Sequence, residues 1–190
     1  MNDSFPSFDQ AESYLDEGAR MNPGPWVSHS RYVAQGARLI AIRYPHLDPE
    51  QAYIAGLLHD IGKIGIAVEI LDKPDKLTEE EYSVMRQHPL LGVNILDPIP
   101  AYETVKPLVL HHHEHYDGSG YPDGLSGENI PLGARIFCLA DVYDALISDR
   151  PYRRALRVEE VFDYIRSREG TEFDPKVVEA FFKVMKNEMD

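Results

Sequence analysis

Apolar residues recur at helical spacing along almost the whole chain. They follow the i, i+3, i+4, i+7 pattern that gathers side chains on one face of an α-helix. Two clear examples are Trp26, Ser30, Val33, Ala37 and Ile40, where a small serine joins the apolar face, and Ile54, Leu57, Leu58 and Ile61. No segment shows the apolar–polar alternation of a half-buried strand. The sequence therefore predicts an all-α fold.

Capping residues mark the starts of several helices. The candidates are Ser7 with Gln10, Thr78 with Glu81, Asp48 before Pro49, and Asp174 before Pro175. The first two pairs have the spacing of a capping box, and the last two place a proline at the first helical position. Together with the periodicity, these signals predict about eight helices. Their expected spans are 7–20, 25–44, 49–66, 78–96, 102–115, 131–148, 157–168 and 174–188.

Prolines and glycines interrupt the helical pattern in two places. Pro89 falls inside the span 78–96 and is expected to kink or restart that helix just after His88. The segment 116–130 contains too many glycines and prolines for a helix. We therefore expect a loop there, between two helices.

Acidic residues outnumber basic ones, 32 against 19, which gives a formal net charge of -13. A chain of this charge repels nucleic acid polymers and anionic membranes. The sequence also lacks a basic N-terminal region followed by an apolar stretch, and no apolar segment reaches membrane-spanning length. We therefore expect a cytoplasmic protein in which Cys138, the single cysteine, is a small core residue. An anionic ligand would need local positive charge from metal ions or arginines.

Histidines and aspartates stand at the ends of apolar helical runs. The pairs His59-Asp60 and His112-His113, and also Asp141, each follow such a run. Consecutive side chains leave a helix about 100° apart, so each pair can straddle a site between helices. Imidazole nitrogen combined with carboxylate oxygen suits iron, manganese, nickel or zinc better than calcium or magnesium. The pattern thus predicts a transition-metal site between helices.

Further motifs extend this pattern over most of the chain. They are His59 to Lys63, Lys73-Pro74 with Leu77-Thr78, His88-Pro89 with Gly92, HHEHYDGSGYP from His112 to Pro122, Ile130-Pro131, Ala134 to Ile136, Ala140 to Leu146, Arg150 to Arg153, and Phe173 to Pro175. Because it carries these motifs in this order, the chain resembles the HD-GYP family of bacterial cyclic-di-GMP phosphodiesterases, a branch of the HD phosphohydrolase superfamily. The resemblance implies a single helical-bundle domain, with residues 1–24 as an N-terminal helical extension and 25–190 as the catalytic core.

The resemblance also implies two divalent transition-metal ions, iron or manganese. Their ligands would be His29, His59, Asp60 and Asp141 for the first ion, and His88, His112 and His113 for the second, with Asp60 bridging the two. A hydroxide between the ions would attack cyclic-di-GMP and release linear diguanylate, which further cleavage would convert to GMP. Lys63 would lie beside the phosphate or the hydroxide, and Asp144 would orient or deprotonate a reacting group.

Substrate contacts are implied for two further regions. Arg150 and Arg153 would bind phosphate and guanine, because guanidinium groups form paired hydrogen bonds to phosphate. The loop residues Gly118, Gly120 and Tyr121 would approach the substrate closely. The resemblance also implies that this loop contacts a diguanylate cyclase. The chain is expected to be a monomer or a homodimer.

One position departs from part of the family. Some members carry a glutamate one helical turn before the first ligand histidine and use it to hold a third metal, whereas this chain has Pro25 there. We therefore expect two metals rather than three, and substrate range could differ as a result.

The sequence leaves other functions open. The substrate could be another cyclic dinucleotide, such as cyclic GMP-AMP, or a nucleoside phosphate. A catalytically silent nucleotide sensor or partner-binding module would have lost ligands or the lysine, and this chain keeps them all. A di-iron oxygenase would dispense with Arg150 and Arg153.

Four polar residues near the motifs have ordinary structural interpretations. His46, His111 and His115 are interpreted as surface or satisfied core histidines. Glu114 either supports His113 from behind or is a buried structural carboxylate.

Overall fold

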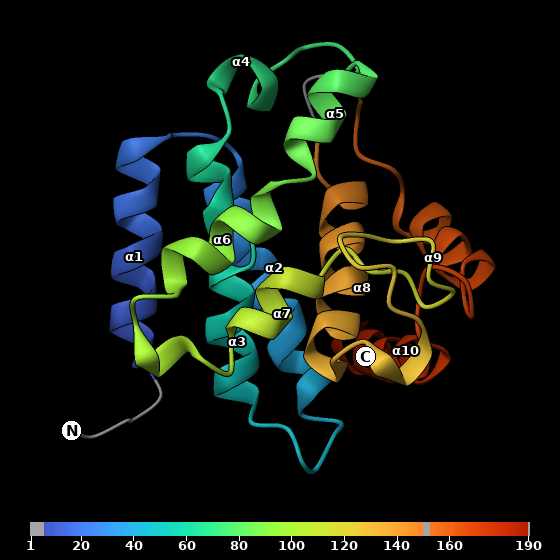
Figure 1. Ribbon diagram of the computed structural model, residues 1–190. Helices are drawn as coiled ribbons and strands as arrows, with labels where there is room; N and C mark the ends of the chain where they lie inside the picture. Colours follow the sequence, from blue (N-terminus) through green and yellow to red (C-terminus); the bar gives the residue numbers. More distant parts are fainter. Residues whose placement is uncertain (1–5, 150–152, 190) are drawn as a thin grey trace.

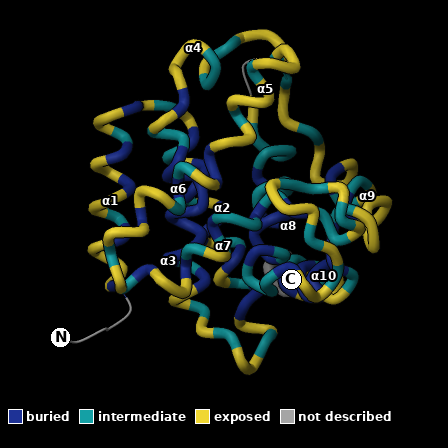
Figure 2. The backbone as a smooth tube through the Cα atoms, in the orientation of Figure 1, coloured by how far each residue is buried: buried dark blue, intermediate teal, exposed yellow. Residues whose placement is uncertain are grey.

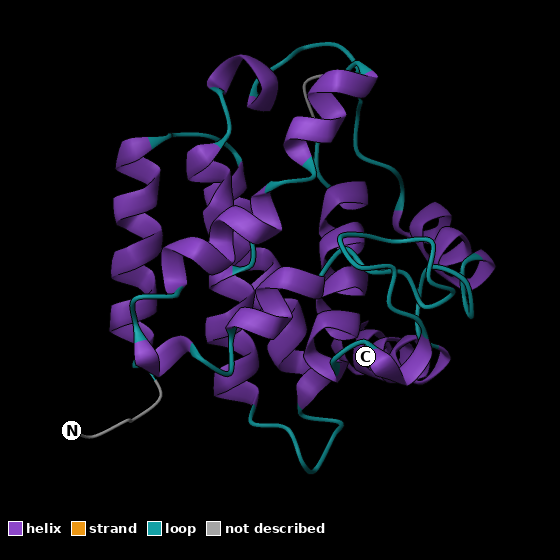
Figure 3. Cartoon of the chain, in the orientation of Figure 1, coloured by secondary structure: helices purple, strands orange, loops and turns teal. Residues whose placement is uncertain are grey.

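The computed structural model describes residues 6–149 and 153–189, with side chains described as far as Lys186. This part of the chain is helical and has no β-strand (Figure 3), so the predicted all-α fold is confirmed. The α-helices are α1 (Phe8–Met21), α2 (Trp26–Ala41), α3 (Pro49–Leu58), α4 (Val68–Leu71), α5 (Glu79–Met85), α6 (His88–Leu96), α7 (Lys106–His111), α8 (Leu132–Ile147), α9 (Val158–Ser167) and α10 (Pro175–Met189). Short 3₁₀ helices are η1 (Ile61–Gly65), η2 (Pro100–Tyr102) and η3 (Gly127–Asn129). None of the helices in the described ranges is long and apolar enough to span a bilayer.

The predicted helix starts are confirmed by their capping hydrogen bonds. Ser7 and Thr78 each form a complete capping box, with Gln10 and Glu81 respectively. Asp48 accepts hydrogen bonds from two backbone amides of α3, and Asp174 accepts one from the amide of Lys176 in α10. Each such cap contributes about 1 kcal/mol to helix stability.

Three predicted spans were too long. The helix expected over 49–66 ends at Leu58, and the chain continues through Asp60 into η1. The span 78–96 is divided into α5 and α6, as expected from Pro89, but α6 begins at His88 itself rather than just after it, with Pro89 in its first turn. The span 102–115 is reduced to η2 and the short α7. In each case a helix ends or begins beside a metal-ligand candidate: α3 before His59, α6 at His88 and α7 before His112.

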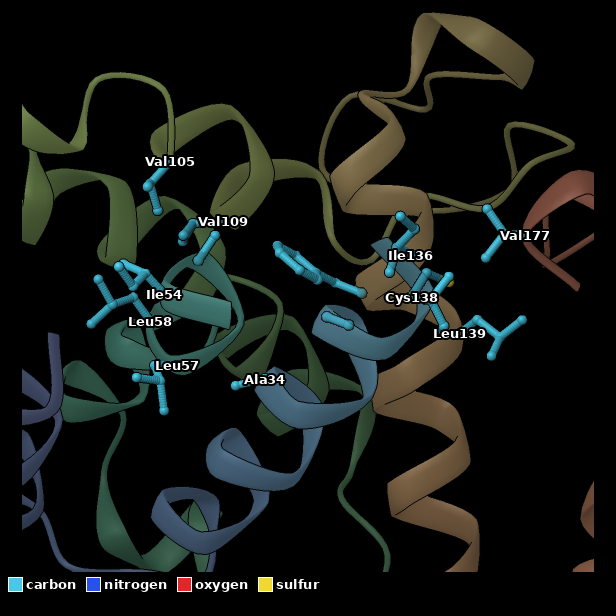
Figure 4. Packing of buried hydrophobic residues seen from close by; sticks show 14 of the residues in the cluster. Ala34, Ile54, Leu57, Leu58, Val105, Val109, Ile136, Cys138, Leu139 and Val177 are labelled. Atoms are coloured by element: carbon cyan, nitrogen blue, oxygen red, sulfur yellow. The ribbon is translucent and has the colours of Figure 1, made fainter. Parts of the chain in front are cut away.

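Three helices form the middle of the molecule, with α2 packed against α3 on one side and α8 on the other (Figure 1). Burial is concentrated in these helices, whereas α4, α5 and the adjoining turns are largely exposed (Figure 2). Figure 4 shows side chains of α2, α3, α7 and α8 in this core, including Ala34, Leu57, Val109 and Ile136. The polar centre therefore lies among helices that a continuous apolar core holds in place.

Helix α1 packs on α3 and η1. Its Ala11 and Leu15 are fully buried and belong to the same apolar cluster as the central helices. Beyond its C-terminus, the Asn22 amide donates hydrogen bonds to the carbonyls of Lys63 and Ile66, at 3.1 and 2.9 Å. The N-terminal segment thus holds the turn that follows Asp60.

Candidate metal centre and active site

The structure brings together the seven residues predicted as metal ligands. They come from five places in the fold: His29 from α2, His59 and Asp60 from the end of α3, His88 from the start of α6, His112 and His113 from the end of α7, and Asp141 from α8. Five of them are at least 95% buried, while His113 and Asp141 are more open. Their ligating atoms fall into two groups of possible metal ligands, connected through Asp60.

The first group contains His29, His59 and Asp141. His29 Nε2 lies 2.7 Å from Asp141 Oδ1 and 4.0 Å from Asp60 Oδ2. His59 Nε2 lies 3.4 Å from the same Asp60 oxygen. These imidazole nitrogens and carboxylate oxygens therefore converge on one side of Asp60.

The second group contains His88, His112 and His113. His88 Nε2 is 3.3 Å from His112 Nε2 and 3.2 Å from His113 Nε2. The other oxygen of Asp60, Oδ1, lies 3.3 Å from His88 Nε2 and 3.9 Å from His112 Nε2. Asp60 thus presents one oxygen to each group, as a bridging carboxylate requires.

Backbone carbonyls determine which ring nitrogen of three histidines faces the centre. Nδ1 of His59, His88 and His112 lies 2.7 Å from the carbonyl of Gly56, Met85 and Val109, respectively. A carbonyl only accepts, so each Nδ1 is the donor and Nε2, the atom that could bind a metal, faces inward. The Nε2 atoms of His88 and His112 lie 3.3 Å apart, where both could bind one cation.

Two buried polar atoms at the centre lack a hydrogen-bond partner among the described residues. They are His59 Nε2 and Asp60 Oδ1. An unpaired polar atom in a buried position is costly, and coordination to a cation would satisfy both atoms. The residues therefore fit a pair of transition-metal ions.

The electrostatics of the centre keep the ligands in their metal-binding forms. Burial lowers the pKa of His59, and lowers those of His112 and His113 further, to about 3 for His113. Burial opposes ionisation of Asp60, but Lys63 and His59 hold its pKa well below the usual range. The three rings are thus neutral and the carboxylate is charged at physiological pH.

His29 differs from the other rings. Burial disfavours its charged form, but hydrogen bonds to Asp141 and Asp144 raise its pKa to about 9. The same hydrogen bond helps to keep the pKa of Asp141 low despite burial. A proton and a metal ion would compete for His29 Nε2.

The two predicted catalytic residues outside the ligand set occupy different places. Lys63 lies in η1, with Nζ 2.5 Å from Asp60 Oδ2, and it lines the cleft above the centre. Asp144 is buried in α8, with Oδ2 2.5 Å from His29 Nδ1. Asp144 thus contacts the nitrogen of His29 that points away from Asp141.

The loop after α7 places Tyr121 on the metal centre. Its ring stacks on that of His113, with centroids 4.9 Å apart and planes 27° apart. The backbone of Gly120 packs so closely that a Cβ atom there would lie 2.3 Å from the amide nitrogen of His115. Gly118 adopts a positive φ of 85°, which side-chain-bearing residues rarely do. The two glycines therefore shape the loop that presents Tyr121.

A cleft of about 710 Å³ opens over the centre, within the range typical of small-molecule sites. Arg153 lines it, although its guanidinium donates to the carbonyls of Ala145, Leu146 and Arg154 near the end of α8. Arg150, the other arginine predicted to bind substrate, lies outside the described residues.

The structure adds cleft residues to which we assigned no role from sequence. They include Lys76, Tyr82 and Arg86. Arg86 lies over the rings of Tyr82 and Tyr121, 4.7 and 5.0 Å from their centroids, and no carboxylate of the described part of the chain pairs with it. In the sequence, the only sign that Arg86 belongs to the site was its position two residues before His88. The direction of its side chain depends on the break between α5 and α6.

Comparisons with known proteins point to one family. A family model described as an HD domain matches residues 19–177. The cyclic di-GMP phosphodiesterase response regulator RpfG of Xanthomonas campestris is 48% identical over 132 residues, which cover 68% of this chain and 35% of that protein. The cyclic di-GMP phosphodiesterase PA4108 of Pseudomonas aeruginosa is 45% identical over 87% of this chain and 41% of its own length. A 3'3'-cGAMP-specific phosphodiesterase of Vibrio cholerae is 37% identical over 84% of this chain and 35% of its own length.

Solved structures show the same fold. A cyclic GMP-AMP specific phosphodiesterase of V. cholerae superposes with a TM-score of 0.70 at 22% identity, over 94% of this chain and 49% of that one. The HD domain of the L. monocytogenes phosphodiesterase PgpH, in complex with cyclic-di-AMP, gives a TM-score of 0.69 at 16% identity, over 93% of this chain and 95% of that one. The chain spans about a third of the length of the RpfG relative.

Proposed function

We propose that this chain, which belongs to the HD domain family, is a metal-dependent phosphodiesterase that hydrolyses cyclic-di-GMP. The observation that carries the proposal is the pair of ligand groups that share Asp60. The two oxygens of Asp60 lie 3.4 Å from His59 Nε2 and 3.3 Å from His88 Nε2. Two sites that share a carboxylate in this way suit two divalent ions that act on one phosphodiester. The relatives from X. campestris and P. aeruginosa that are named as cyclic di-GMP phosphodiesterases are 48% and 45% identical to this chain, which supports the same reaction class.

Within this proposal, the metal ligands are the seven residues brought together by the fold. Bound transition-metal ions would supply Lewis acidity toward a phosphoryl oxygen and would lower the pKa of water. Iron or manganese is the expected metal, because both accept mixed imidazole and carboxylate ligands. Pro25 in place of a glutamate supports two ions rather than three.

The chain's own residues then position charge and protons. Lys63 keeps its ammonium group at Asp60 and at the floor of the cleft, where it would stabilise negative charge on a bound phosphodiester. Asp144 accepts a hydrogen bond from His29 Nδ1, which fixes the orientation of that ring. We therefore assign Lys63 a catalytic role and Asp144 a positioning role.

The cleft suits a substrate with flat bases and two phosphates. Tyr82 and Tyr121 offer aromatic faces, while Lys76, Arg86 and Arg153 offer positive charge. The chain as a whole has a formal net charge of -13 and would repel an anionic substrate. The positive side chains in the cleft would attract the substrate locally. Cyclic GMP-AMP shares this chemistry, and the 3'3'-cGAMP-specific relatives make it the second candidate substrate.

Three finer predictions belong to the same proposal. The products would be linear diguanylate and, after a second cleavage, GMP. The surface around Gly118 and Tyr121 would contact a diguanylate cyclase. The protein would act in the cytoplasm as a monomer or homodimer.

The experiment that tests the proposal couples metal analysis to turnover. Protein purified without oxygen would be analysed for elements and assayed by chromatography with cyclic-di-GMP and, separately, with 3'3'-cGAMP. Asp60→Ala should abolish turnover and lower the metal content while helical content by circular dichroism stays unchanged. Asp163→Ala, which changes an exposed aspartate of α9, is the matched control and should behave as wild type. Full activity in Asp60→Ala, or in protein shown to be free of transition metal, would contradict the proposal.

A further inference from the structure

A second cluster of metal-ligating side chains lies beside the loop after α7. It consists of His111, Glu114 and Asp123, whose ligand atoms lie within 4.8 Å of one another. His111 Nε2 is 3.0 Å from Asp123 Oδ2, and the Asp123 amide donates a 2.8 Å hydrogen bond to Glu114 Oε1. None of the three lines the cleft over the metal centre. The catalytic proposal therefore leaves this cluster without a role.

The ring of His111 is oriented like those of the metal-centre histidines. Its Nδ1 donates a 2.9 Å hydrogen bond to the carbonyl of Pro107, one turn earlier in α7. A carbonyl only accepts, so Nδ1 is the donor there and Nε2, the atom that could bind a metal, faces the Asp123 carboxylate. A cation placed between Nε2 and Asp123 Oδ2 would interact favourably with both atoms.

Glu114 gives independent support for a cation at this place. Its side chain is 1% exposed, and its Oε2 has no hydrogen-bond partner in the described part of the chain. No lysine or arginine of residues 6–149 and 153–186 forms an ion pair with Glu114 or Asp123. A buried carboxylate oxygen with neither a hydrogen-bond partner nor a countercharge is costly. A cation held by all three side chains would neutralise both carboxylates.

We propose that His111, Glu114 and Asp123 form a separate site for a divalent transition metal of the zinc type. One imidazole and two carboxylates make a ligand set that zinc accepts. Neighbouring ligand atoms of a tetrahedral zinc site lie about 3.3 Å apart, close to the observed contact between His111 and Asp123. The Asp123 side chain is 56% exposed, so the ion can enter from solvent and water can complete its coordination.

A metal at this site would fasten the loop to α7. Asp123 lies two residues after Tyr121, and the Tyr121 amide donates to the carbonyl of His113. An ion that joins Asp123 to His111 would therefore fix the segment that lays Tyr121 on His113. The site holds the loop and has no part in the chemistry itself.

Zinc stoichiometry tests this site without any measurement of turnover. Tag-free wild-type protein, His111→Ala and Asp123→Asn would be stripped of metal, equilibrated with Zn²⁺, dialysed and analysed for zinc per chain. We expect His111→Ala to retain one zinc fewer than wild type, and Asp123→Asn to bind that zinc about tenfold more weakly or worse. His46→Ala, which removes an exposed histidine elsewhere, should leave the count unchanged.

The same comparison in an Asp60→Ala background separates this proposal from the catalytic one. His111→Ala should still remove one zinc there, even if the phosphodiesterase proposal fails. Zinc should also slow hydrogen exchange over residues 116–124 in wild type but not in His111→Ala. Equal zinc counts in wild type, His111→Ala and Asp123→Asn would overturn the site and leave a simple ion pair between His111 and Asp123. Asp123→Asn changes an exposed side chain, so its result stands even if His111→Ala fails to fold.

Discussion

Lys63 and Asp60 show how single side chains determine the charge of the centre. The ammonium group lies 2.5 Å from the carboxylate that connects the two ligand groups, and Lys63 is not one of the seven residues proposed as metal ligands. Its substitution should therefore affect reaction rate more than metal binding.

The corresponding prediction concerns Lys63→Ala. We expect kcat for cyclic-di-GMP to fall by about 100-fold or more, because a positioned acid or cation contributes at least that much to such reactions. Metal content should stay within the range of wild type, since the seven ligands remain. Steady-state kinetics with elemental analysis of the same preparation checks both statements. A variant that loses metal and activity together, and regains wild-type kcat when metal is added in excess, would show that Lys63 acts only by holding Asp60.

Arg86 is the residue whose role depends most on the fold. It lies between Tyr82 and Tyr121 at the cleft and has no carboxylate partner among the described residues. A guanidinium without a countercharge at the site of an anionic substrate should contribute to substrate binding.

For Arg86→Ala we expect KM for cyclic-di-GMP to rise about tenfold or more while kcat changes by less than threefold, since a charge-assisted hydrogen bond contributes ~1.5–3 kcal/mol. Arg86→Lys should give an intermediate KM because it keeps the charge but loses the planar stack. Arg43→Ala, at an exposed arginine beyond α2, is the control. An unchanged KM in Arg86→Ala would remove Arg86 from the substrate site.

Between elements, the contact of η1 with α6 brings the two ligand groups together. Gly62 follows Asp60 by two residues, and a Cβ atom on it would lie 1.9 Å from the carbonyl of His88 and 2.5 Å from the amide of Gly92. The backbones of the two elements therefore touch at this point. Any side chain at position 62 would push His88 away from Asp60.

Gly62→Ala should lower the free energy of unfolding by about 1–3 kcal/mol, the usual cost of overpacking, because the obstacle is backbone rather than a flexible side chain. It should also weaken metal binding. Gly36→Ala is the matched control: its Cβ would meet Ala140 at an ordinary 3.5 Å, and alanine in α2 should be neutral or stabilising by about 0.5–1 kcal/mol. Denaturant unfolding and metal titration of both variants check the prediction. Equal stability of Gly62→Ala and Gly36→Ala would refute the close contact.

Helix starts could be predicted from sequence, whereas some helix ends could not. Ser7, Asp48 and Thr78 cap their helices through local hydrogen bonds within three residues, and such bonds depend only on the nearby sequence. The end of α3 at Leu58 depends instead on the distant contact of Gly62 with His88. A continuous apolar pattern therefore gave no sign that the helix stops before Asp60.

At the scale of the molecule, the candidate site was more predictable than its surroundings. Residues such as His59 and Asp141 stand out because apolar runs precede them, and the fold brings them together as the family resemblance implied. Arg86 and Asp123 gave no such signal, because their neighbours are set by the packing of α5 and by the path of the loop. Tertiary contacts decide the role of these residues.

Metal should also stabilise the fold, because five helical segments meet at its ligands. Without it, His59 Nε2 and Asp60 Oδ1 are buried without hydrogen-bond partners among the described residues, and the Nε2 atoms of His88 and His112 face each other at 3.3 Å. Metal at a hundredfold excess over its Kd adds about 2.7 kcal/mol per site to the free energy of unfolding, which is about 5.4 kcal/mol for two sites. We therefore expect a chelator to lower the Tm by about 10–20 °C, at ~2–4 °C per kcal/mol for a chain of this size.

Thermal unfolding with chelator, and after manganese or iron is added back, measures this shift. Asp60→Ala should show a clearly smaller dependence of Tm on metal, because it lacks the carboxylate that serves both groups. His111→Ala retains all seven ligands of the centre, so most of the shift should remain in that variant. A Tm that stays constant while elemental analysis shows complete loss of metal would mean that the five segments hold their positions without the ions, and that the cost of the unpaired ligand atoms is met by water.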